Sequence, residues 1–120
     1  MNKLSVTGLG ILVALGVSTL AWAAEGKDVS VKGEVVDTYC FASMGAKGAS
    51  HKQCGITCAK KGIPVGLLED GTGKLYVLLP NKDKGTIPDD VINKMGETTT
   101  ITGKAYAAGG TSFLTIESVK

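Results

Sequence analysis

The amino-acid sequence predicts a mainly β (α+β) domain: a five-stranded barrel that carries a helical, cysteine-containing insert and a second short helix. Three observations support this fold class. Apolar and polar residues alternate with a period of two in several stretches, which is the pattern of half-buried strands. Glycine-rich turns at residues 70–73 and 109–110 separate neighbouring strand-like stretches, as hairpins require. The roughly 97 residues that follow a predicted signal peptide at residues 1–23 are enough for one hydrophobic core and too few for two domains.

The first strand is expected over residues 29–37, where valines alternate with polar residues and Gly33 keeps the same register. A loop rich in Gly, Ala and Ser is expected over residues 41–49. Ser50 and Gln53 have the spacing of a capping box, which predicts a helix that starts at His51. Gly62 suits the left-handed residue after such a helix, and the proline that follows prevents its continuation.

Two further strands are expected at residues 65–69 and 74–79, paired as a hairpin across the turn at residues 70–73. Pro88, followed by two aspartates, is typical of a helix start, so a short helix is expected from Pro88 to Gly96. The fourth strand is expected at residues 97–106, which are rich in β-branched residues. The fifth is expected at residues 112–119, after the turn at residues 109–110.

Without the insert, the order of elements is strand, strand, strand, helix, strand, strand. This order, the position of Gly33 and the closing pattern of residues 101–104, 109–110 and 114–116 resemble small bacterial periplasmic proteins with an OB-like fold. The resemblance implies a five-stranded barrel in which the second helix lies between strands three and four. The Cys/His-containing insert, at about residues 40–63 between strands one and two, has no counterpart in the plainest members of that group.

Residues 1–23 have the pattern of a cleavable signal peptide. Lys3 precedes an uncharged apolar stretch over residues 6–22, and small residues at Ala21 and Ala23 suit a signal peptidase. A membrane anchor is the alternative, because a spanning helix can be as short as roughly 17 residues. Several glycines in the stretch disfavour that alternative, so we expect cleavage after Ala23 and no membrane anchor thereafter. A single OB-like domain over residues 24–120, periplasmic or secreted, is the expected product.

The charge of this expected domain is nearly balanced. Residues 24–120 hold 12 lysines and 11 acidic residues, a formal charge of +1, and the chain has no arginine. Arginine is the side chain best suited to phosphate and base recognition. The composition therefore disfavours a nucleic-acid partner and leaves a periplasmic protein partner open.

The chemistry of the sequence is concentrated in three cysteines and one histidine. His51, Cys54 and Cys58 are spaced three and then four residues apart, so a helix from His51 places them on one face. Cys40, at the end of the first strand, can fold over that face. Three thiols and one imidazole are the ligands of a tetrahedral Cys₃His metal site. Lysines 52, 60 and 61 nearby are expected to favour the thiolates that bind metal.

Zn²⁺ and Cu(I) are the metal ions that suit these ligands best, and Met44 adds a thioether as a possible further ligand for the softer ion. The leading prediction is therefore a small metal-binding protein without enzymatic activity. No second histidine or paired acid and base accompanies the hydroxyl side chains, so a hydrolase triad cannot be built.

Two alternatives remain open at this stage. A disulfide from Cys40 to Cys54 or to Cys58 would leave one spare cysteine and staple a binding or adaptor module. Such a crosslink would stabilise the domain by roughly 3 kcal/mol. A thiol redox protein is the third possibility, although a C-x-x-C motif on a βαβ scaffold is absent.

Overall fold

The computed structural model describes residues 26–120 of the chain. The predicted signal peptide, residues 1–23, lies outside the described residues. None of the helices in the described part is long and apolar enough to cross a lipid bilayer.

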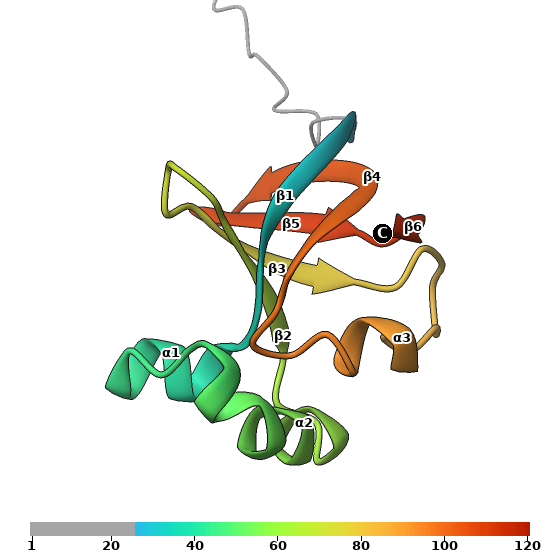
Figure 1. Ribbon diagram of the computed structural model, residues 1–120. Coiled ribbons are helices and arrows are strands. Elements are labelled where there is room, and N and C mark those ends of the chain that lie inside the picture. Colours follow the sequence, from blue (N-terminus) through green and yellow to red (C-terminus); the bar gives the residue numbers. More distant parts are fainter. Residues whose placement is uncertain (1–25) are drawn as a thin grey trace, which may run out of the picture.

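The protein is mainly β and forms a closed, five-stranded mixed barrel (Figure 1). Its strands run in the order β1-β2-β3-β5-β4, and a further pairing of β1 with β4 closes the barrel. β3 and β5 are parallel, whereas the other pairs are antiparallel. The strands are β1 (Lys27–Asp37), β2 (Val65–Glu69), β3 (Leu75–Leu79), β4 (Thr98–Ala108), β5 (Thr111–Thr115) and the short β6 (Ser118–Val119). This architecture is consistent with the predicted OB-like barrel.

Closure depends on β1, which is long enough to pair with two strands. Residues 27–34 pair with β4, and residues 33–37 pair with β2. Gly33 lies where both pairings meet, and a Cβ atom there would come within 2.3 Å of the Leu68 carbonyl oxygen. Only glycine allows the strands this close approach, which explains the glycine in an otherwise valine-rich strand.

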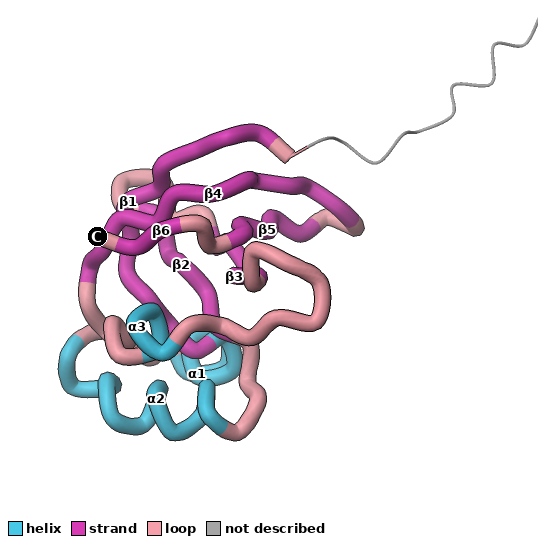
Figure 2. Tube along the Cα trace, turned by 90° about the vertical axis from the view of Figure 1, so that its right-hand side faces the viewer, coloured by secondary structure: helices cyan, strands magenta, loops and turns pink. Residues whose placement is uncertain are grey.

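The core fills the barrel from the alternating inward positions of the strands. Val35, Leu67, Ile101 and Leu114 have no exposed surface. α3 (Asp89–Ile92) adds Val91 and Ile92 to this core. In Figure 2 α3 lies at one end of the barrel, on the same side as the other helices. Burying apolar side chains is the main favourable contribution to folding of such a domain.

Most strand predictions agree with the structure within two residues, and the 65–69 strand and its hairpin pairing are confirmed. Two predictions were wrong in extent. The helix after Pro88 ends at Ile92 instead of reaching Gly96. The last predicted strand is broken after Thr115, because the chain passes close to Gly103 and then pairs with β4 as β6. A Cβ atom at Gly103 would lie 1.7 Å from the Thr115 carbonyl oxygen.

The insert between β1 and β2 is helical, as expected, but begins earlier. It consists of α1 (Thr38–Met44), the 3₁₀ turn η1 (Ala49–His51) and α2 (Lys52–Lys60). The loop predicted for residues 41–49 was wrong up to Met44, because Asp37 caps the start of α1 and Gly45, with φ 65°, ends it. The predicted capping box was also wrong, because Ser50 belongs to η1 and α2 has no side-chain cap.

Two glycines and two polar contacts hold the insert against the end of the barrel. A Cβ atom at Gly55 of α2 would lie 2.5 Å from Met95 Cγ, and one at Gly96 would lie 2.4 Å from the Gly48 carbonyl oxygen. The Gly48 amide donates a hydrogen bond to the Glu34 carboxylate, and the Lys52 ammonium pairs with the Glu97 carboxylate. The insert is therefore a packed part of the domain.

Candidate metal centre

Asp37, the last residue of β1, organises the site although it was not among the predicted ligands. Its side chain has no exposed surface. Oδ1 accepts a hydrogen bond from the Cys40 amide at 2.8 Å, and Oδ2 lies 2.6 Å from His51 Nε2. One buried carboxylate thus joins the end of β1 to the start of α1 and to the histidine before α2.

The sequence explains why the carboxylate occupies this place. Asp is among the preferred residues at a helix N-cap, because its oxygen accepts from a free amide of the first turn. The absence of a side chain at Gly55 lets α2 approach the barrel, since a Cβ atom there would lie 2.5 Å from Met95 Cγ. Helix α2 therefore packs closely enough for the preceding residue, His51, to reach the carboxylate.

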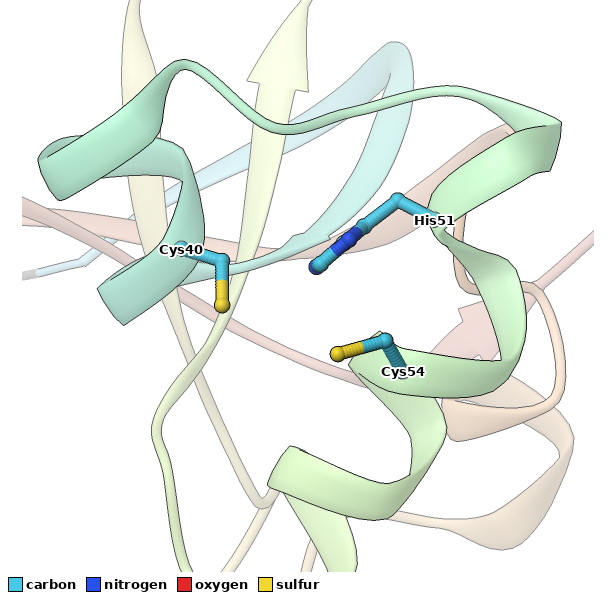
Figure 3. A group of neighbouring side chains, drawn as sticks. All are labelled: Cys40, His51 and Cys54. Atoms are coloured by element: carbon cyan, nitrogen blue, oxygen red, sulfur yellow. The ribbon is translucent and has the colours of Figure 1, made fainter.

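Two groups of potential metal ligands meet at Cys40. In the first group, donor atoms of Cys40, His51 and Cys54 all lie within 4.8 Å of one another (Figure 3). In the second group, Asp37, Cys40 and Cys58 meet the same criterion. The thiol of Cys40 belongs to both groups, so the other four residues lie around this one side chain. Figure 3 shows Cys40 on α1 facing His51 and Cys54 across the space between the two helices.

No family model, curated protein or solved structure matches this chain. What the site can do must therefore be argued from its own geometry.

The structure brings together three of the four predicted ligands directly. Cys58 reaches Cys40 together with Asp37 and is not within 4.8 Å of every member of the first group. His51 belongs to η1 and not to α2, so the predicted common helical face holds only in part. Met44, predicted as a possible further ligand, is 67 % exposed.

The cysteines differ in their access to solvent, and none forms a disulfide. Cys40 is buried, Cys58 is partly buried and Cys54 is exposed. All three thiols are free, so the predicted Cys40 disulfides are absent from this structure. The site is therefore closed around Cys40 and open at Cys54.

The protonation of the thiols differs from the expectation based on nearby lysines. Burial, reinforced by the Asp37 carboxylate, raises the pKa of Cys40 to about 11. Burial and the charge of Asp37 also raise the pKa of Cys58. The predicted easy ionisation is thus wrong for these two thiols, because desolvation and a neighbouring negative charge both disfavour thiolates.

Asp37 itself remains charged. Burial raises the pKa of its carboxyl group, but hydrogen bonds from the Cys40 amide and from His51 outweigh this effect and leave the pKa below its usual value. A carboxylate bound to one ring nitrogen fixes a histidine so that the other nitrogen can bind a metal. Because Asp37 occupies Nε2, the nitrogen of His51 that remains is Nδ1.

Proposed function

We propose that the protein is a small periplasmic or secreted metal-binding protein with an OB-type barrel and no enzymatic activity. It binds one soft or borderline ion, Zn²⁺ or Cu(I), through Cys40, His51 and Cys54, with Cys58 as the fourth ligand. The observation that carries this proposal is the Asp37–His51 hydrogen bond beside two thiols, because a buried carboxylate that orients a histidine is typical of metal sites.

The distances suit closure around an ion. Two thiolates that bind one Zn²⁺ at about 2.3 Å each in tetrahedral geometry lie about 3.8 Å apart. The present donor atoms lie within 4.8 Å of one another, so a shift of about 1 Å between α1 and α2 is enough. Cys58 follows Cys54 by one helical turn on α2 and already lies close to Cys40.

Metal analysis combined with thiol counting tests the proposal. We expect protein purified anaerobically from the periplasm to carry about one equivalent of metal and to show three reactive thiols after metal removal. In competition titrations with Zn²⁺ and Cu(I), Cys40→Ser and Cys54→Ser should weaken binding strongly. Met44→Leu, which removes the thioether of an exposed side chain, is the matched control and should bind Zn²⁺ as the unmodified chain does.

A disulfide-stapled adaptor is the second candidate, and the same position of Cys40 favours it. The Cys40 sulfur lies within 4.8 Å of the sulfurs of both Cys54 and Cys58. For this candidate we expect the purified protein to carry no metal, to show one reactive thiol and to have a mass lower by two hydrogen atoms than that of the reduced chain. His51→Ala would then leave the thiol count, the disulfide and the lack of bound metal unchanged. A thiol redox protein is disfavoured, because the raised pKa values of Cys40 and Cys58 reduce their reactivity at neutral pH.

A further inference from the structure

The insert differs in charge from the rest of the protein. Residues 38–64 contain four lysines and no acidic residue, a formal charge of +4. The remainder of the described chain holds eight lysines and ten acidic residues, a formal charge of −2. The insert is therefore the basic segment of a nearly neutral protein, and it carries the cysteines and the histidine of the candidate metal centre.

Most of this positive charge is available to a partner. Lys52 is paired with Glu97. Lys47, Lys60 and Lys61 are exposed and take part in none of the ion pairs found among residues 26–120. Exposed charges that are not neutralised within the molecule attract an oppositely charged surface and speed its approach.

The same insert carries exposed apolar side chains. Tyr39 is 64 % exposed and Met44 is 67 % exposed, and they are the two large hydrophobic side chains exposed in the described part of the chain. Both belong to α1. Tyr and Met are among the side chains enriched at protein interfaces.

The exposed thiol also lies in the insert. Cys54 is the exposed cysteine of the site and lies on α2, opposite Cys40 of α1 (Figure 3). The first described residues lie at the far end of β1, away from the insert (Figure 1). Exposed apolar side chains, unpaired lysines and an accessible metal ligand are thus combined in the insert, on its two helices and the residues that follow them.

We propose that the insert surface, defined by Tyr39, Met44, Lys47, Cys54, Lys60 and Lys61, docks an acidic partner protein that exchanges the metal ion at Cys54. This inference rests on the proposed metal binding. The partner we expect is a protein whose interface has an acidic rim, an apolar centre and a cysteine that binds metal.

The exchange is a ligand substitution without electron transfer. The partner's thiol loses its proton as its sulfur binds the ion, and the bond from the ion to Cys54 breaks. The Cys54 thiolate takes up a proton, so the charge balances and the ion keeps its oxidation state. Cys54 is suited to leave first because it is the exposed ligand, whereas Cys40 is buried.

Site-specific photocrosslinking in the organism that makes the protein tests the surface. A photoreactive residue replaces Tyr39 or Met44 in the full chain, and the same residue at exposed Lys82 is the control. We expect positions 39 and 44 to give an adduct with one acidic protein that position 82 does not give. An adduct with phospholipid, an adduct with a second copy of this chain, or equal labelling from all three positions overturns the proposal.

The second test measures the rate of metal transfer to the partner protein identified by crosslinking, after its purification. We expect the variant Lys47→Glu/Lys60→Glu/Lys61→Glu to slow metal transfer at low salt by about tenfold or more. The control variant Lys27→Glu/Lys32→Glu/Lys82→Glu has the same change of charge on other exposed lysines, and its transfer rate should stay within about twofold of the unmodified rate. A small neutral chelator should remove the metal from either variant at a rate within about twofold of that for the unmodified chain. Equal slowing by both triple variants overturns the proposal.

The two proposals fail in different ways. A protein that carries no metal but gives the specific adduct removes the metal-binding function and the exchange step, and leaves only the docking surface. A protein that binds one equivalent of metal but gives no specific adduct keeps the metal-binding function and removes the docking surface.

Discussion

At the scale of single residues, Asp37 connects the fold to the candidate site. Its two carboxylate oxygens are used by different parts of the insert, one by the Cys40 amide and one by His51. These partners compensate for the burial of the Asp37 charge, whereas removal of one of them would leave a buried charge without its partner. The same side chain therefore starts α1 and sets which nitrogen of His51 is free.

Asp37→Asn separates these two roles. Asn is as good an N-cap as Asp, so we expect α1 to remain. The amide group has lost the charge and the second acceptor, so it no longer holds His51 with Nδ1 free. We expect metal affinity to fall about 10- to 100-fold, measured by competition titration with Zn²⁺ or Cu(I). Far-UV circular dichroism checks that the helices persist, and an affinity within twofold of the unmodified chain would contradict the role assigned to Asp37.

The raised pKa of Cys40 predicts how the stability of the metal-free protein depends on pH. Its pKa is about 11 in the folded state and 9.0 without the fold, so the folded state holds the proton more tightly. The stabilising contribution is complete below pH 9 and is lost as the pH rises towards 11. We expect the free energy of unfolding in urea to fall over this range.

Other side chains titrate in the same range, so Cys40→Ala is the comparison. This variant should be less stable at pH 8 but should lose less stability between pH 9 and 11. Parallel pH curves for the variant and the unmodified chain would show that the fold does not raise the pKa of Cys40.

At the scale of elements, the approach of α2 to the barrel depends on Gly55. A Cβ atom there would lie 2.5 Å from Met95 Cγ and 2.8 Å from its sulfur. In an exposed helix Ala is favoured over Gly by about 1 kcal/mol. Here we expect the crowding to reverse the sign, so that Gly55→Ala lowers the free energy of unfolding by about 1–3 kcal/mol.

Urea unfolding of the metal-free protein measures this change, and Thr57→Ala on the same helix is the control. Thr57 is exposed, so its replacement tests helix propensity without the contact to Met95. A Gly55→Ala protein that is more stable than the unmodified chain would mean that Met95 moves aside at no cost.

The helical elements show where sequence reasoning reached its limit. The spacing of Cys54 and Cys58 correctly indicated a helix that presents both thiols to Cys40. Helix α1 was missed because residues 41–49 were interpreted as a loop of small side chains. The informative signal was Asp37 as an N-cap with Gly45 as the left-handed C-cap, but Asp37 was assigned only to the strand. Its role in the site arises from contacts between segments 14 residues apart, such as that with His51, which no local pattern encodes.

At the scale of the whole molecule, local patterns predicted the strands, but pairing across long distances could not be derived from them. The hairpin of β2 and β3 follows from its turn, whereas closure of the barrel needs β1 and β4, about 70 residues apart along the chain, with Lys27 opposite Ala105. The expected order of elements pointed to a barrel only through resemblance. The register, and the close approach of Thr115 to Gly103, depend on backbone contacts that the structure alone reveals.

The barrel and the insert should respond differently to metal removal. The buried core cluster is formed by strand residues, α3, Met95 and Ile116, and the insert adds the partly buried Ile56 and Ala59 at its edge. An ion at Cys40, His51 and Cys54 would join α1 to the start of α2, since these ligands lie on separate segments of the insert. We therefore expect a chelator to increase amide hydrogen exchange in residues 38–60 while β4 and β5 remain protected.

Hydrogen exchange measured by mass spectrometry with and without metal checks this expectation. At a free metal concentration of 1,000 times the dissociation constant, binding stabilises the folded protein by about 4 kcal/mol. Opening of the insert alone breaks the site, so its exchange should slow in the metal-bound protein by a large factor. Exchange in β4 and β5 should slow only where it requires unfolding of the whole domain. If a chelator instead exposes all strands at once, the ion is part of the barrel's own stability and the insert is not a separable metal-binding element.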